Sequence, residues 1–191
     1  MRSPATASAR RMPARNIKGL EEAEAKDLYR IARLYWKEAG RCEESGAYLA
    51  ASVFIGAALE AMITLMVDIC SAEALATGKI LTKGGQTADL RRLNLSQLLA
   101  VAKAAGWLPG REEIANATRR RRQKDVGDLA ELIVEARNLV HPGRYVRVHI
   151  RERLTKRRVE YLFEILEVSR DWLVHHNMKS LRRAMDAEWL L

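Results

Sequence analysis

One short stretch of the sequence holds an arginine, an asparagine and a histidine at a spacing that suits phosphodiester chemistry. In the run Glu135–Tyr145, Arg137 and His141 are four residues apart, and Asn138 directly follows Arg137. Histidine exchanges protons near neutral pH, while a guanidinium binds a phosphate and stabilises charge that develops on it. The three residues therefore suit a site for phosphodiester chemistry, in which one histidine supplies half of an acid–base pair. A two-fold dimer would supply the second histidine.

A helix that ends near His141 would position these side chains. The pattern predicts a helix from Asp125 to His141 that is stopped by Pro142-Gly143. Its inward positions are Leu129, Leu132, Ile133, Ala136 and Val140, with Leu139 beside them. Residues four apart lie on one helix face, so we expect Arg137 and His141 to reach the same space. The alternative is structural: the helix dipole favours a cationic histidine in the last turn, and Arg137 pairs with Glu135 or a neighbouring helix.

Other residues that carry chemistry give weaker signals. Glu60 lies in an apolar stretch, where pairing with an arginine is favoured over tuning the histidine. His175 and His176 are adjacent, so on a helix they diverge and do not share a metal. Cys42 and Cys70 form no zinc pattern, and no glycine-rich nucleotide loop is present. The sequence therefore predicts neither a metal nor a cofactor.

The charge of the chain is concentrated in three segments. The 191 residues carry 33 Lys and Arg against 24 Asp and Glu, a formal net charge of +9. Residues 1–18, 119–124 and 144–158 carry +5, +5 and +6, so the rest of the chain is net acidic at −7. Such segments suit a polyanion such as RNA, or else form solvated surface. The candidate nucleic-acid-binding residues are Arg119, Arg120, Arg121, Arg122, Lys124, Arg144 and Arg147.

Hydrophobic patterning predicts an all-α fold, a bundle of about five helices. The expected helices include an amphipathic one over residues 20–39 that ends at Gly40, and a short one over residues 95–105. A long final helix is expected from about Thr155 to the C-terminus. The most apolar stretch, residues 47–67, predicts a long central helix buried in the bundle.

The central stretch is also long enough to span a bilayer, which leaves a membrane-associated protein as an alternative. Its central Glu60 and the acids at both ends argue against a transmembrane segment. No secretory signal is expected either, because residues 1–18 lack an apolar run. We therefore expect a cytoplasmic protein without a membrane partner.

The remaining segments complete a single domain over residues 19–191. Residues 71–94 contain several glycines and predict a loop with one or two short helical pieces. Residues 1–18 mix Arg, Ser, Ala and Pro and predict a disordered basic tail. Residues 146–151 alternate apolar and polar side chains, which indicates an extended segment or hairpin arm.

The stretch RNLVHPGRY, preceded by YLAASVFIGAALEAMITLMVD and followed by a final helix, resembles the HEPN (higher eukaryotes and prokaryotes nucleotide-binding) superfamily over roughly residues 20–178. The resemblance implies a small helical bundle that forms a homodimer. Many members are metal-independent ribonucleases in toxin–antitoxin and other defence systems, whereas others are non-catalytic binding modules. By this resemblance, Arg137 binds phosphate, Asn138 is its polar neighbour and His141 transfers the proton, with RNA as substrate and an antitoxin or other defence protein as partner.

This sequence differs from the family nucleases in the distance between the two key residues. Only Asn138, Leu139 and Val140 separate Arg137 from His141, fewer than the family nucleases usually have. Removing one residue from a helix rotates the histidine by about 100°. The shorter spacing favours the alternative function, a dimerisation or binding module for nucleic acid or a protein partner.

Overall fold

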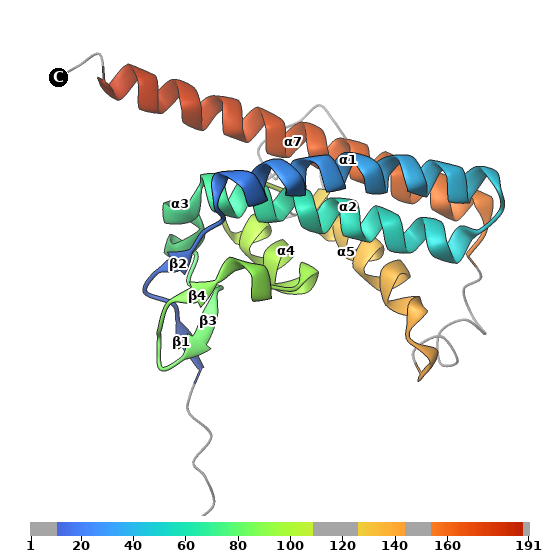
Figure 1. Ribbon diagram of the computed structural model, residues 1–191, viewed down its shortest axis with the longest axis horizontal. Helices are drawn as coiled ribbons and strands as arrows, with labels where there is room; N and C mark the ends of the chain where they lie inside the picture. Colours follow the sequence, from blue (N-terminus) through green and yellow to red (C-terminus); the bar gives the residue numbers. More distant parts are fainter. Residues whose placement is uncertain (1–10, 109–125, 144–153, 189–191) are drawn as a thin grey trace, which may run out of the picture.

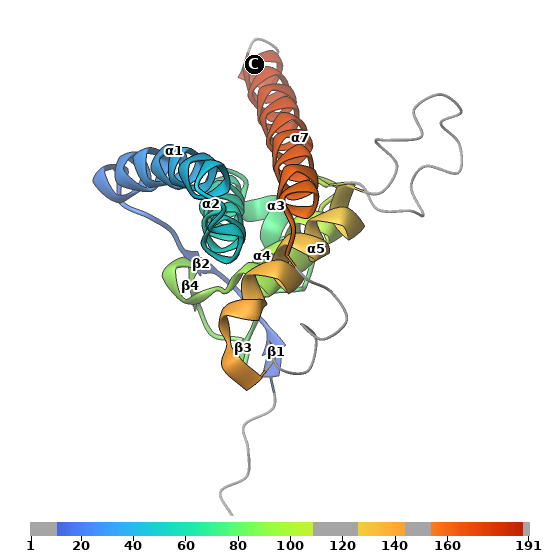
Figure 2. The same cartoon turned by 90° about the vertical axis from the view of Figure 1, so that its right-hand side faces the viewer.

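The computed structural model describes residues 11–108, 126–143 and 154–188, with side chains up to residue 177 (Figures 1 and 2). It confirms a mostly helical bundle. The described α-helices are α1 (Glu22–Glu44), α2 (Tyr48–Ile69), α3 (Ser71–Ala76), α4 (Leu95–Ala104), α5 (Val126–Arg137) and α7 (Lys156–Glu188). The structure also describes two 3₁₀ turns, η1 (Leu90–Arg92) and η3 (Asn138–Val140).

Helix α2 is the centre of the bundle, as its apolar sequence predicts. It packs against α1, α4, α5 and α7. Its buried residues are Ala51, Ser52, Ile55, Gly56, Ala58, Leu59, Ala61, Ile63, Met66 and Val67. By length and composition, α2 is the one helix in the described part that could cross a membrane, and more than half of its most apolar stretch is buried inside the protein.

Helix α1 lies alongside α2 and is longer than the sequence pattern indicates (Figure 1). The expectation that it ends at Gly40 is wrong, because it continues to Glu44. The turn instead uses Gly46, whose φ of 75° lies in the left-handed region that glycine adopts without a Cβ clash. Gly40 sits in the helix interior, where an added Cβ would meet nothing within 4 Å.

Part of the expected disordered tail is ordered, so that expectation is wrong for residues 11–18. Strand β1 (Arg11–Pro13) pairs antiparallel with β3 (Leu81–Lys83), and β2 (Ile17–Lys18) pairs in parallel with β4 (Ala88–Asp89). Burial of Ile17, only 9 % exposed, explains why this segment docks. Residues 1–10 lie outside the described part. The loop over residues 71–94 therefore holds two short strands besides the expected helical pieces, α3 and η1.

Helix α7 begins where expected and is held to the body by a shared hydrogen-bond acceptor. The buried Trp107 indole donates from Nε1 to Glu73 Oε2 over 2.9 Å. His176 Nε2 lies 2.9 Å from the same oxygen. This cluster fixes α7 against α3 and the end of α4. At 33 residues α7 is about 50 Å long, and its C-terminal part projects beyond the other helices in both views (Figures 1 and 2).

Candidate functional site

Arg137 is the last residue of α5 and packs closely on α2. Its Nη1 lies 2.8 Å from Glu60 Oε2. The approach requires glycine at position 56, because an added Cβ there would lie 2.7 Å from Arg137 Cδ and 2.9 Å from its Cβ. A third of the Arg137 side chain is still exposed. The expected pairing of Glu60 with an arginine is thus confirmed, and so is the alternative that Arg137 pairs with a neighbouring helix.

Burial is the main influence on the Glu60 carboxyl. It raises the pKa of Glu60, while the charge and hydrogen bond of Arg137 act in the opposite direction. The ion pair therefore only partly offsets the cost of removing this carboxylate from water. Arg137 is held in one position by a partner whose own charge is costly to bury.

The face of α2 under α5 carries a serine and a glycine that the sequence pattern did not indicate, beside the predicted Glu60. Ser52, Gly56 and Glu60 are spaced four apart, so they lie along one face. The Ser52 hydroxyl donates to Leu49 O over 2.8 Å and lies 3.4 Å from the carbonyl oxygen of Ala136 in α5. The signal that could have found this contact is a serine and a glycine one turn apart in an otherwise apolar helix, followed by a glutamate.

His141 does not extend α5, so the expectation of one helical face for Arg137 and His141 is wrong. The α-helix ends at Arg137, and residues Asn138–Val140 form the 3₁₀ turn η3. A 3₁₀ turn advances about 120° per residue instead of the about 100° of an α-helix, so the three residues of η3 move His141 off the helix face that carries Arg137. His141 itself has extended backbone, and its N–H donates to Asn138 O over 3.2 Å.

The same change of helix type alters the burial of the neighbouring residues. Leu139 is buried as expected, but Val140 is 50 % exposed, so its inward assignment is wrong. Ile133 and Ala136 are buried, and Leu129 and Leu132 pack partly buried against the core. His141 is exposed, and its imidazole has no hydrogen-bond or ion-pair partner within the described residues.

An apolar hollow of about 750 Å³ lies beside Val140. The N-terminal half of α2 forms most of it, together with the loop before this helix and Leu154. Tyr48 and Leu49 contribute partly exposed apolar surface to it. The region at the end of α5 thus contains an anchored cation (Arg137), an exposed imidazole (His141) and the apolar hollow beside Val140.

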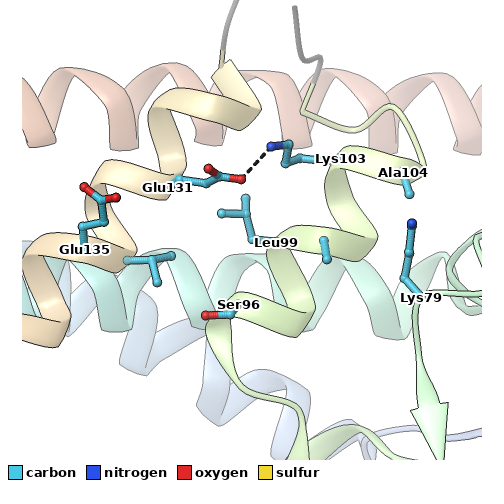
Figure 3. A pocket seen from close by; sticks show the side chains of 9 residues that line it. Lys79, Ser96, Leu99, Lys103, Ala104, Glu131 and Glu135 are labelled. Atoms are coloured by element: carbon cyan, nitrogen blue, oxygen red, sulfur yellow. Dashed lines mark hydrogen bonds and ion pairs between the residues drawn. The ribbon is translucent and has the colours of Figure 1, made fainter. Parts of the chain in front are cut away.

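A second hollow of about 600 Å³ lies between α4 and α5, away from Val140 (Figure 3). Of the two lysines that line it, Lys103 bridges Asp128 Oδ1 and Glu131 Oε1, each over 2.7 Å. Burial alone would lower the pKa of Lys103, but the hydrogen bonds that its ammonium donates to the two carboxylates outweigh burial and raise the pKa. Lys103 is therefore occupied in joining α4 to α5, and this hollow offers no chemistry that the sequence motif uses.

The other candidate residues fall into two groups. Arg119, Arg120, Arg121, Arg122, Lys124, Arg144 and Arg147 lie outside the described residues, as does the alternating segment 146–151. Within the described residues, no group of three His, Cys, Asp or Glu side chains is arranged to hold a metal ion. His176 instead contacts Glu73, and the His175 ring lies 6.5 Å from that of Trp172.

Comparison with protein-family models, with curated proteins and with solved structures finds no match to this chain.

Proposed function

We propose that this protein is a HEPN-like module that binds RNA through the end of α5 without cleaving it. The observation that carries the proposal is the 3₁₀ turn after Arg137, which rotates His141 away from the arginine. The guanidinium and the imidazole of one chain therefore do not share a helix face. Each remains available for a separate contact along an RNA strand.

The anchoring of Arg137 favours binding of a phosphate. Glu60 and Gly56 hold the side chain in place, so little rotamer freedom is lost when a ligand binds. The ion pair occupies only part of the guanidinium, which has five N–H donors. The exposed third of the side chain leaves donors for a phosphate oxygen.

The apolar hollow beside Val140 suits the other part of a nucleotide. Tyr48 lines it, and aromatic side chains stack on unpaired bases. Proteins that bind single-stranded RNA combine a cation with an aromatic, apolar surface. The cation binds the phosphate, and the base stacks on the aromatic surface.

The first turn of α7 carries further positive charge. Lys156, Arg157 and Arg158 occupy its first turn, which contains no acid. The positive end of a helix dipole disfavours cations, so these bases cost stability there. Lys156 lies 3.8 Å from Glu160, which offsets part of that cost. Lys156 and Arg157, kept at this unfavourable position, support a role in binding a polyanion.

The test measures binding of a fluorescently labelled single-stranded RNA by anisotropy at several salt concentrations, with EDTA present. We expect affinity to fall steeply with salt, and the R144Q/R147Q variant to lower the slope of log K against log salt by about 2. The matched control is K26Q/R30Q, which removes the same charge from α1 and should leave the slope almost unchanged. Binding that does not change with salt would rule out the proposal.

A metal-independent endoribonuclease is the second candidate, favoured by the exposed imidazole of His141, which has no partner among the described residues. In this reaction a His141 removes the proton of a ribose 2′-hydroxyl, whose oxygen attacks the adjacent phosphorus. The bond to the 5′-oxygen breaks, and a second His141 protonates that oxygen, leaving a 2′,3′-cyclic phosphate. Because one chain supplies one such histidine, the reaction needs a homodimer. The cytoplasmic location of the protein and its binding to an antitoxin or another defence protein remain predictions.

The same RNA incubated with EDTA separates the two candidates. Intact RNA with salt-dependent binding supports the binding module. Cleavage that disappears in His141→Ala while binding persists supports the nuclease and contradicts the binding module. Cleavage unchanged in His141→Ala would contradict the nuclease assignment.

A further inference from the structure

A groove with apolar walls runs between α1, α2 and α7. It encloses about 510 Å³, with Met62 and Met66 of α2 among its lining residues. Tyr29, Ile69 and Val174 line it and are 58 %, 58 % and 56 % exposed. In Figure 2, α1 and α7 diverge on either side of α2, and Figure 1 shows the same separation towards the end of α7. Large apolar side chains this exposed on one groove indicate a surface that a partner covers.

Polar groups in this groove also lack partners. Asn177 Oδ1 is buried and has no hydrogen-bond partner in the described part of the chain. Arg33 and Lys37 line the groove and are exposed, and neither has an ion-pair partner among the described residues. The third cation, Arg170, is already occupied, because it lies 5.2 Å from the Trp36 ring and 2.7 Å from Asp171. The groove therefore fits a segment that combines apolar side chains with acids.

The sequence after Met185 has this composition. Residues 186–191 read Asp-Ala-Glu-Trp-Leu-Leu, two acids followed by three large apolar residues. The first three of them belong to α7, which continues past Asn177 to Glu188 and leads away from the groove of its own chain. Nine helical residues move Asp186 about 14 Å beyond Asn177 along the axis. A straight α7 therefore presents this segment to another molecule and not to its own groove.

We propose that residues 186–191 of one copy dock in the α1–α2–α7 groove of a second copy, and that the exchange is reciprocal. Asp186 and Glu188 face Arg33 and Lys37 of the other copy, and Trp189 and the leucines cover Ile69 and Val174. The arrangement is a two-fold dimer, in which each copy gives one segment and receives one. It does not depend on the proposed binding of RNA.

The test is the dimer dissociation constant of the full chain from sedimentation equilibrium. We expect Ile69→Lys in the groove and Trp189→Lys in the segment each to raise the Kd at least about tenfold. The matched control is Leu34→Lys on α1, because Leu34 is 51 % exposed and does not line the groove. Its Kd should equal that of the unmodified chain. Circular dichroism checks that every variant keeps its helix content.

Charge reversal identifies the two surfaces that meet. R33E/K37E and D186K/E188K should each weaken the dimer, and the chain carrying all four changes should regain most of the affinity. A chain that is monomeric throughout the micromolar range overturns the proposal, because its groove is then covered by its own residues, by another protein or by solvent. A dimer that is insensitive to both charge sets, or one not restored by the combination, overturns it as well.

Discussion

The two ends of α2 meet the rest of the molecule in different ways. Toward its N-terminal half, the face with Ser52, Gly56 and Glu60 is closed by α5, which approaches closely enough to require a glycine. Toward its C-terminal half, Met62, Met66 and Ile69 line a groove that no described element fills. The first contact is completed within the chain, and the second is the one we propose a second copy completes. The difference teaches that an apolar helix is buried only at those turns where another element packs on it.

The largest expected effect is at the closed contact. Gly56→Leu places side-chain atoms where Arg137 Cβ and Cδ already lie, so the free energy of unfolding should fall by about 3 kcal/mol. Urea denaturation followed by circular dichroism measures it. The control is Gly40→Ala, where the space around the added Cβ is open and stability should rise by about 0.5–1 kcal/mol. Equal effects at the two glycines would contradict the close packing of α5 on α2.

Removing the arginine should have the next largest effect. Arg137→Met leaves the Glu60 carboxylate partly buried without its compensating charge, which should cost about 2 kcal/mol at neutral pH. The cost should shrink at low pH, because protonation of Glu60 removes the buried charge. Adding Glu60→Gln to Arg137→Met should recover most of the loss at neutral pH, as a double-mutant cycle would detect. A loss that is equal at both pH values would show that Glu60 is not responsible.

Removing the acid alone should have a smaller effect. Because burial raises the pKa of Glu60 above its usual 4.5, Glu60→Gln should change stability by no more than about 1 kcal/mol at neutral pH. A raised pKa in the folded state contributes stability that is present below the unfolded pKa and is lost as pH rises through the folded pKa. The unmodified chain should therefore lose stability relative to Glu60→Gln as pH rises from below 4.5 towards neutrality. The opposite slope would mean that the ion pair outweighs burial.

The smallest effect on the isolated chain is expected in the groove. Val174→Lys alters a side chain that is 56 % exposed, so the stability of the dilute monomer should change by less than about 0.5 kcal/mol. Its effect should appear only where copies associate, as a loss of the increase in melting temperature with protein concentration. Gly56→Leu should instead lower the melting temperature by a similar amount at every concentration. Identical concentration dependence in the two variants would remove the distinction between the closed and the open face.

Much of the bundle was predictable, because its helices repeat apolar residues at helical spacing. The central and final helices and α4 lie close to the predicted ranges. The end of α1 was placed too early, since Gly40 tolerates the helix interior and the left-handed residue is Gly46. The ordering of residues 11–18 was missed, because a two- or three-residue strand carries no periodicity of its own and depends on a partner some 70 residues away.

The candidate site was predicted only in part. The pairing of Glu60 with an arginine follows from the cost of burying a lone carboxylate, so the sequence could indicate it without naming the partner. The orientation of His141 could not be predicted from the sequence, because the residue types of the segment Arg137–His141 fit an α-helix and a 3₁₀ turn equally well. Burial of Leu139 in place of Val140 distinguishes them, and that depends on packing against the body.

The sequence by itself determined the helical class, the apolar centre and the residues available for chemistry, because these follow from periodicity and side-chain type. Only the tertiary structure decided which helix meets which, and therefore that Arg137 lies on Gly56 beside Glu60 while His141 is rotated away. It also decided that one face of α2 is closed and another is open. Contacts between residues far apart in the chain depend on shape and distance, which residue types alone do not specify.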